Sequence, residues 1–371
     1  MMNSKHRTWL VSALASSALV MTACSAGGEA SSGGDGDPDT LTLSVVTPEE
    51  GMIDGTNWWA EELESRSDGR LKVDIFYNES LLSGPETLDG IKDGRITGGW
   101  YSDAYYPKQL PLFQITGIPF ETTDSYAHSR TMFELYQNNE AFREEIQSTG
   151  VHITHFVPYT QTSFATKTPL DDAKDLSGKR FRAAGITGQA IGDLGSDAVF
   201  LNVAELYESV ERGVIDGVAA YPYDMLAATG IAEVAPHVTD TGWGQYATTG
   251  IAVSLDWYES LPDDLRTIVD ETSRELQIER SAEVLNRIEQ EACDTFKEQG
   301  ATVTVWDEAQ SQALSDTLGD KYVKSYKESA VANGANREKV DAFYDQFHEL
   351  YEKHVVDSPY QDNLSSCDAG S

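Results

Sequence analysis

Three basic residues stand within four positions of a chain that is otherwise strongly acidic. Lys179, Arg180 and Arg182 lie in the stretch DLSGKRFRAAGITG, whereas the whole chain has 61 Asp and Glu residues against 27 Lys and Arg residues. A planar guanidinium group can donate two parallel hydrogen bonds to a carboxylate, and such charge-assisted pairs are among the strongest polar contacts in proteins. The stretch therefore has the chemistry needed to recognise a carboxylate.

The place of Arg182 on a predicted strand favours it as the anion-binding group. Side chains alternate along a strand, so Arg180 and Arg182 share one face and Phe181 takes the other. Arg182 is nearer the carboxyl end of the strand, where ligands bind in open α/β sheets, and the small residues that follow leave room for an anion. We expect Arg180 to be solvated or structural. The alternative for Arg182 is an interlobe or surface salt bridge.

The residue types that catalysis or metal binding would need do not gather in a recognisable motif. The sequence has no GxSxG, CxxC or HExxH pattern, and its seven His residues are scattered. A hydrolase or lyase would need a nucleophile with its base, or a metal constellation. We therefore expect no enzymatic activity, no metal and no cofactor, and an exported hydrolase or lyase is the alternative.

The first 23 residues have the pattern of a signal peptide. A short basic region with Lys5 and Arg7 precedes an apolar run at 9–21, which is too short to span a bilayer as a helix. The run ends in VMTAC, where small residues precede Cys24 as a lipoprotein signal peptidase requires. We expect a lipid on Cys24, whose two acyl chains suffice for stable anchoring. An ordinary secretory signal is the alternative.

A Gly, Ser and Asp tether at 24–40 would hold a folded body away from the outer face of the cytoplasmic membrane. Loss of Lys5 and Arg7 with the signal leaves 25 basic residues against 61 acidic ones, a net charge of about −36. Such a chain has no basic stripe to offset phosphate charge, so nucleic acid is excluded as a partner.

Two cysteines, Cys293 and Cys367, remain once Cys24 is assigned to the lipid. An even pair in an exported protein predicts one disulfide. It would attach the polar tail, 356–371, to a helix. Two free thiols are the alternative.

The body of the chain alternates strands with helices. Residues 41–47 and 71–77 have the alternation of strands, and helices are predicted at 57–67 and 84–94. This order predicts a largely parallel sheet that is covered on two sides. The roughly 325 residues after the tether suffice for two α/β lobes.

One internal repeat points to two lobes with a similar plan. LDGIKDGRITGGWY at 88–101 resembles YESVERGVIDGVAAY at 207–221, and each combines a short helix, a Gly, an apolar link, a second Gly and an aromatic residue. Chance similarity is the alternative.

The last third of the chain is mainly helical. Residues 256–300 predict a helix of about 35–40 residues, or roughly 50–60 Å, which is long enough to run along both lobes. A strand at 301–307 and helices at about 308–331 and 336–354 follow.

Four segments together resemble the solute-binding proteins of tripartite ATP-independent periplasmic (TRAP) transporters, of the C4-dicarboxylate-binding type. LSGKRFRAAG is similar to the family's L-K-G-x-K-x-R element, and AELYESVERGVIDG to its S-E-x-Y-x-A-L-x-x-G-x-V-D-G. IKDGRITGG with LPLFQITGIPF, and DWYESLPDDLRTIVDE, resemble two further elements. The matches keep their order and spacing across 42–350.

The resemblance implies an α/β, two-lobed periplasmic-binding-protein-like fold (type II) with a long helix spanning both lobes. Such a protein, expected to be a monomer, closes over an organic acid and delivers it to TRAP membrane permease subunits. Arg182 matches the arginine with which the family grips its carboxylate. We expect lobe 1 at 41–157 and about 239–265, and lobe 2 at 158–238 and about 266–355. A lipid-anchored sensor with the same fold is the alternative.

The sequence departs from the family at two ligand positions. Thr162 stands where sialic-acid-type members have a second basic residue, and Ala220 where many members have a ligand-binding Asn. Aromatic walls would instead suit a planar or apolar organic acid. Core packing is the alternative for each aromatic candidate. With Arg182, the ligand-binding candidates are Trp100, Tyr101, Ser102, Tyr159, Thr162, Tyr221, Trp243 and Tyr246.

Two acidic residues near these elements have different expected roles. Asp103, like Ser102, aligns near a polar contact position of the family. Glu205 is expected to fix the start of a helix.

Overall fold

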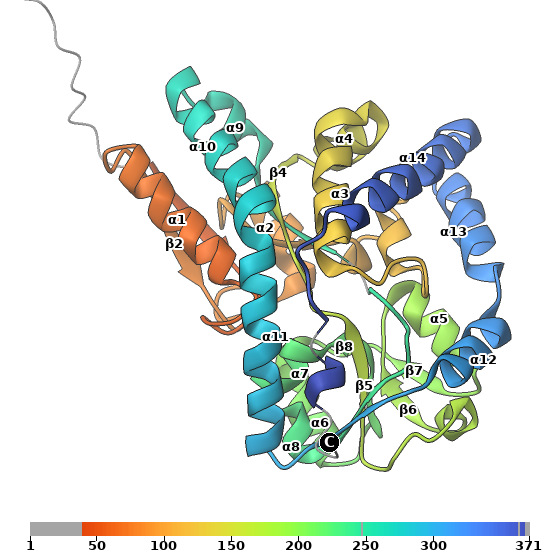
Figure 1. Ribbon diagram of the computed structural model, residues 1–371. Helices are drawn as coiled ribbons and strands as arrows, with labels where there is room; N and C mark the ends of the chain where they lie inside the picture. The colour runs from red at the N-terminus through yellow and green to blue at the C-terminus, as the bar shows by residue number, and fades with distance from the viewer. Residues whose placement is uncertain (1–38, 246–247, 363, 368–371) are drawn as a thin grey trace, which may run out of the picture. The chain divides into compact units, whose positions relative to one another are not determined.

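The computed structural model describes residues 39–245, 248–362 and 364–367. The predicted signal peptide, Cys24 and Tyr246 lie outside these residues, as does nearly all of the tether. The described residues belong to one compact unit, in which two sheets carry their own helices (Figure 1). Within this part of the chain, no helix combines the length and apolarity that a membrane span needs.

The first sheet defines lobe 1 and has the strand order β2-β1-β3-β10-β4. β1 is parallel to β2 and β3, whereas β10 is antiparallel to β3 and β4. The sheet is therefore mixed and not largely parallel as expected, because β10 enters from the other lobe and not through a crossover within lobe 1. Its strands are β1 (Asp39–Ser44), β2 (Leu71–Phe76), β3 (Gly98–Ser102), β4 (Val151–Val157) and β10 (Thr249–Ser254).

The second sheet defines lobe 2 and has the order β11-β9-β5-β8-β6-β7. β5, which arrives from lobe 1, is antiparallel to β8 and β9, and the remaining pairs are parallel. Its strands are β5 (Thr162–Thr166), β6 (Arg180–Arg182), β7 (Asp197–Val199), β8 (Gly217–Pro222), β9 (His237–Asp240) and β11 (Thr302–Val305).

Helices cover both sheets (Figure 1). α1 shows why they form: it has an acidic first turn and a basic last turn, and it buries Trp59 and Leu63, which lie one turn apart. The helices on lobe 1 are α1 (Asp54–Arg66), α2 (Thr87–Lys92), α3 (Ser125–Asn138), α4 (Glu140–Gln147), α9 (Leu255–Ser260) and α10 (Asp263–Glu275). Those on lobe 2 are α5 (Gly185–Asp193), α6 (Leu206–Glu211), α7 (Tyr223–Ala228), α8 (Ile231–Val234), α11 (Ser281–Glu298) and α12 (Glu308–Leu318).

The predicted long helix is present and contacts both lobes. α10, the π-helical turn η6 (Leu276–Arg280) and α11 follow one another without a break. α10 packs against α1 and β4 of lobe 1, and α11 packs against α7 of lobe 2. At the π turn, the Tyr126 hydroxyl donates to the Ile278 carbonyl at 2.8 Å. The Gln277 side chain accepts from the Phe156 amide at 2.8 Å, which ties the turn to β4.

The internal repeat corresponds to equivalent structures in the two lobes. A 3₁₀ turn with a capping box, η1 (Gly84–Glu86), leads into α2, and η5 (Val203–Glu205) leads into α6 in the same way. Glu205 accepts from the Asn202 amide at 3.0 Å, which is the helix-start role expected for it.

The second glycine of each repeat packs directly against a carbonyl group of the strand that the chain enters from the other lobe. A Cβ atom at Gly98 would lie 2.3 Å from the Ala252 oxygen of β10, and one at Gly217 would lie 2.2 Å from the Ala165 oxygen of β5. A side chain at either position would therefore push the antiparallel strand away.

The C-terminal segment returns from lobe 1 to lobe 2. The single helix expected at 308–331 is split at Gly319 into α12 and α13 (Lys321–Ala332). α14 (Arg337–Val356) packs against α3 of lobe 1, and η7 (Leu364–Cys367) contacts β11 and α11. A disulfide joins Cys367 to Cys293 of α11, with the Cα atoms 5.3 Å apart.

These contacts divide the lobes differently from the expected boundaries. Most of α10 and nearly all of α14 fall in the range 266–355 that was expected in lobe 2, but both pack against helices of lobe 1. β9, which overlaps the start of the range 239–265, belongs to the second sheet. The reason is that the long helix and the C-terminal segment each pass from one lobe to the other.

Candidate functional site

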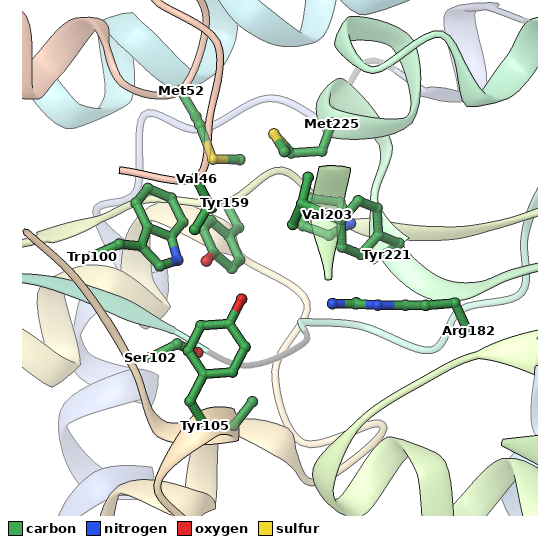
Figure 2. Close-up of a pocket in the computed structure, with 12 residues that line it drawn as sticks. Val46, Met52, Trp100, Ser102, Tyr105, Tyr159, Arg182, Val203, Tyr221 and Met225 are labelled. Atoms are coloured by element: carbon green, nitrogen blue, oxygen red, sulfur yellow. The ribbon is translucent and has the colours of Figure 1, made fainter. Parts of the chain in front are cut away.

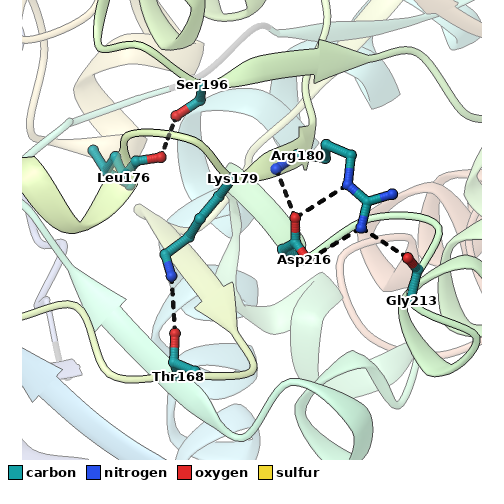
Figure 3. Close-up of polar contacts among 7 residues, drawn as sticks. All are labelled: Thr168, Leu176, Lys179, Arg180, Ser196, Gly213 and Asp216. Carbon is teal, nitrogen blue, oxygen red and sulfur yellow. Dashed lines mark hydrogen bonds and ion pairs between the residues drawn. The ribbon is translucent and has the colours of Figure 1, made fainter.

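The neighbours of Arg182 in the basic cluster are engaged at the surface of lobe 2 (Figure 3). The Arg180 backbone amide donates to Asp216 at 2.8 Å, and its guanidinium group donates to Asp216 at 3.3 Å and to the Gly213 carbonyl at 2.9 Å. Lys179 donates to the Thr168 hydroxyl at 3.0 Å. Exposed ion pairs of this kind contribute little stability. Arg180 is thus an exposed charge at the start of β6 that is paired with Asp216.

Arg182 is the last residue of β6 and is buried, with 4% of its surface exposed. Phe181 takes the opposite face of the strand and packs edge-on against Phe164 in the core. The Arg182 Nε donates to the Leu201 carbonyl at 3.4 Å. Its guanidinium carbon lies 4.9 Å from the centre of the Tyr221 ring on β8. A buried guanidinium group held in this way is preorganised for an anion.

The guanidinium group of Arg182 enters a cavity to which both lobes contribute (Figure 2). The cavity between the lining side chains is small and measures about 30 Å³. Among the described lining residues, Arg182 is the one with a charged side chain. The others are Val46, Met52, Trp100, Ser102, Ala104 and Tyr105 from lobe 1, Tyr159 from the segment between the lobes, and Val203, Tyr221, Pro222 and Met225 from lobe 2.

Two aromatic surfaces bound the cavity. On one side, Trp100 and Tyr159 stack with ring centres 6.1 Å apart and planes tilted by 19°. On the other side, the Tyr221 ring covers the guanidinium group of Arg182 (Figure 2). Met52 and Met225 approach from opposite lobes at a third side. The cavity therefore offers one cation among apolar walls, which suits an anion with an apolar or planar body.

Several predicted ligand residues lie in the cavity, but not all. Trp100, Ser102, Tyr159, Arg182 and Tyr221 line it. These residues come from β3, from β6, from β8 and from the crossing segment after β4, so distant parts of the sequence meet there.

Three predicted ligand residues belong instead to the core. Tyr101 points to the opposite face of β3 from Trp100 and Ser102, and its hydroxyl pairs with Thr149 at 2.8 Å. The Thr162 hydroxyl donates to the Gly244 carbonyl at 2.7 Å. Trp243 is fully buried, 5.4 Å from Phe120 and 5.6 Å from Phe164 between ring centres. Tyr246 lies outside the described residues.

Several lining residues were missed by the sequence analysis. Val46, Met52, Val203 and Met225 lie in loops or at helix starts, where no periodic pattern marks them. Tyr105 could have been noticed, because it follows the strand that carries Trp100 and Ser102 by three residues.

Asp103 is buried and stands in the chain between two residues that line the cavity, Ser102 and Ala104. Thr116 donates to its carboxyl group at 3.0 Å, and Gln114 donates to its carbonyl at 2.7 Å. Burial raises the pKa of Asp103 to about 7, although the hydrogen bond from Thr116 and others to the carboxyl group favour its charged form. Asp103 is not among the residues that line the cavity.

The described part of the chain shows no cluster of three or more His, Cys, Asp or Glu residues that could hold a metal ion. The arrangement around Arg182 offers one fixed cation, neutral hydroxyl groups and apolar walls.

Comparison with known proteins identifies related sequences. A profile of the family described as bacterial extracellular solute-binding protein, family 7, matches residues 43–329. The chain is 26% identical over 215 residues to the outer membrane transporter protein TsaT of Comamonas testosteroni, covering 55% of this chain and 63% of TsaT. It is 24% identical over 229 residues to a monocarboxylate 2-oxoacid-binding periplasmic protein of Nostoc, covering 59% and 60%. It thus spans less than two thirds of the length of these relatives.

Solved structures share the fold. The TRAP solute-binding protein of Rhodoferax ferrireducens T118, in complex with copurified benzoate, superposes with a TM-score of 0.76 at 20% identity, over 85% of this chain and 98% of that one. A marine metagenome TRAP protein specific for aromatic acid ligands, in complex with 3-hydroxybenzoate, gives 0.76 at 18% identity, over 86% and 99%. These likenesses confirm the two-lobed α/β fold expected from the sequence.

Proposed function

The chain belongs to the bacterial extracellular solute-binding proteins of family 7, the binding proteins of TRAP transporters, and from this premise we propose that it captures an organic carboxylate between its lobes and delivers it to a membrane permease. One observation carries the proposal. Arg182 is buried at a cavity that both lobes line, and it is the charged side chain among the described lining residues. A ligand carboxylate there would pair with a fixed guanidinium group in a largely desolvated site.

The ligand in this proposal has a planar or apolar body. Trp100 and Tyr159 offer a stacking surface, and Met52 and Met225 offer polarisable apolar contacts. A second carboxylate on the ligand would meet these walls without a described cationic partner and would lose its hydration. Benzoate and 3-hydroxybenzoate, the ligands of the two solved relatives, and monocarboxylic 2-oxoacids have suitable chemistry.

Binding would close the lobes by a hinge motion. Besides the C-terminal segment, the chain passes between the lobes in two segments, after β4 and before β10, and along the α10–η6–α11 helix. A π-helical turn lies where this helix leaves lobe 1, and such turns often mark functional sites in helices. We propose that this turn and the two crossing segments absorb the motion.

The protein works outside the cytoplasm in this proposal, as its family does. A lipid on Cys24 would hold it, as a monomer, at the outer face of the cytoplasmic membrane, close to the permease subunits. The ligand would be released unchanged, since capture and delivery need no chemical step.

A thermal-shift screen tests the function. The panel contains benzoate, 3-hydroxybenzoate, 2-oxobutanoate and succinate, and a bound ligand raises the melting temperature by mass action. We expect at least one monocarboxylate to stabilise the protein and to be recovered intact. Chemical turnover of the ligand, or no stabilisation by any carboxylate, would contradict the proposal.

A further inference from the structure

Tyr105 lies across the cavity from Arg182 and comes from the other lobe. It ends the 3₁₀ turn η2 (Asp103–Tyr105), which follows β3 directly. Figure 2 shows its hydroxyl group directed into the space that the Arg182 guanidinium group enters from lobe 2. Of the lobe 1 residues that line the cavity, Tyr105 and Ser102 have a hydroxyl group. A hydroxyl so placed can donate a charge-assisted hydrogen bond to a carboxylate.

The ring of Tyr105 is held by close packing against Gly84. A Cβ atom at Gly84 would lie 2.5 Å from Cε2 of the ring and 2.8 Å from its hydroxyl oxygen, so no larger residue fits without moving the ring. Tyr106, next in the chain, donates its hydroxyl to the Gly84 carbonyl at 3.1 Å and accepts from the Leu88 amide at 3.1 Å. The turn that carries Tyr105 is therefore fixed to the segment that contains Gly84.

The same region touches lobe 2. The Tyr105 ring meets Phe200 edge-on, with ring centres 6.4 Å apart, and Phe200 is 50% exposed. Glu79 accepts from the Gly84 amide at 3.0 Å and from the Ala204 amide of lobe 2 at 3.4 Å. Tyr105 thus reaches its place beside Arg182 in an arrangement where the lobes are in contact.

We infer that the Tyr105 hydroxyl group is the lobe 1 half of the carboxylate site and that Gly84 positions it. The inference rests on the proposed function and deepens it. Arg182 holds the carboxylate from lobe 2, and Tyr105 donates to the same group from lobe 1. A carboxylate then links the two lobes, whereas an uncharged amide of the same shape offers a weaker acceptor. Tyr105 therefore sets both the preference for an anion and the coupling of binding to closure.

Calorimetric titration of the full chain tests this inference. For each of the four carboxylates of the panel, its affinity is compared with that of the corresponding amide. Tyr105→Phe keeps the ring and its contact with Phe200 but removes the donor, so carboxylate affinity should fall about tenfold or more while amide affinity stays within about twofold. Gly84→Ala should displace the ring and lower the same carboxylate-to-amide preference. Gly192→Ala is the matched control, because a Cβ atom there meets open space, and it should bind as wild type.

The outcomes separate this inference from the proposed function. If Arg182→Ala lost carboxylate binding while Tyr105→Phe bound as wild type, only the role of Tyr105 would be overturned. The proposed function would stand. An equal loss for carboxylate and amide in Tyr105→Phe would also overturn it, because the effect would then be general to the pocket. A wild-type protein that binds no carboxylate would overturn both. The melting temperature of each variant is also measured without ligand, so that a folding defect is recognised.

Discussion

The guanidinium carbon of Arg182 lies 4.9 Å from the centre of the Tyr221 ring, and the two residues belong to the adjacent parallel strands β6 and β8. The ring covers one face of the guanidinium group, so the edge with its N–H donors remains directed at the cavity (Figure 2). Arg182 is in register with Val218, three residues before Tyr221, and the positive φ of 43° at Ala220 interrupts the regular alternation of β8 between these two residues. The second sheet thus orients the residue that we place at the ligand.

Replacement of Tyr221 tests this orientation. Tyr221→Leu removes the aromatic face and should weaken carboxylate binding about two- to thirtyfold, because a partly buried cation–π contact contributes about 0.5–2 kcal/mol. Tyr221→Phe keeps the face and should bind within about twofold of wild type. Titration calorimetry measures both variants, and equal affinities for the two would show that the ring does not orient Arg182.

The Cys293–Cys367 disulfide should stabilise the fold by a measurable amount. It closes a loop with a sequence separation of 74, for which the chain-entropy estimate is about 4 kcal/mol. Cys367→Ser should lower the free energy of unfolding in urea, and Cys293→Ser should lower it by a similar amount. Two free thiols in the mass spectrum of the exported protein would contradict the pairing.

Asp103 should make stability depend on pH in a defined window. Burial raises its folded-state pKa to about 7 from a usual value of 3.8, so the folded protein prefers the neutral acid. The stability contributed by this group is complete below about pH 4 and is lost as the pH rises through about 7, at up to about 1.4 kcal/mol per pH unit.

Asp103→Asn isolates this effect, because an amide does not titrate. The free energy of unfolding of wild type minus that of the variant should be smaller at pH 8 than at pH 4.5 by at least about 1 kcal/mol. Other buried groups cancel in the difference, including Asp224 and Asp240, whose pKa burial also raises, to about 6. A difference that is constant with pH would show that Asp103 is already charged in the folded protein.

The two-lobed α/β fold and the position of Arg182 beside a cavity could be predicted from the sequence for physical reasons. Alternation and turn residues mark the strands and helices, and the small residues after Arg182 mark the cavity side of β6. The antiparallel entry of β5 and β10 could not be predicted from local patterns, because it depends on how the chain crosses between lobes.

The aromatic candidates were harder to separate into cavity and core. Strand alternation could have excluded Tyr101 once Trp100 was placed, since neighbouring residues on β3 face opposite ways. Trp243 gives no such signal, and its position between Phe120 and Phe164 follows from tertiary packing. Met52 and Met225 come from different lobes, so they lie close together only because the lobes are in contact. They are far apart in the sequence, and no local pattern links them.

The central claim is that Arg182 holds the ligand carboxylate, and one paired measurement tests it most directly. Arg182→Ala and Arg180→Ala are titrated with the tightest-binding carboxylate of the panel. Both variants lose an arginine from the same strand, but Arg180 is exposed and paired with Asp216. The account predicts that Arg182→Ala loses about 2–5 kcal/mol of binding free energy and that Arg180→Ala binds as wild type. An Arg182→Ala variant that binds within about threefold of wild type would contradict it.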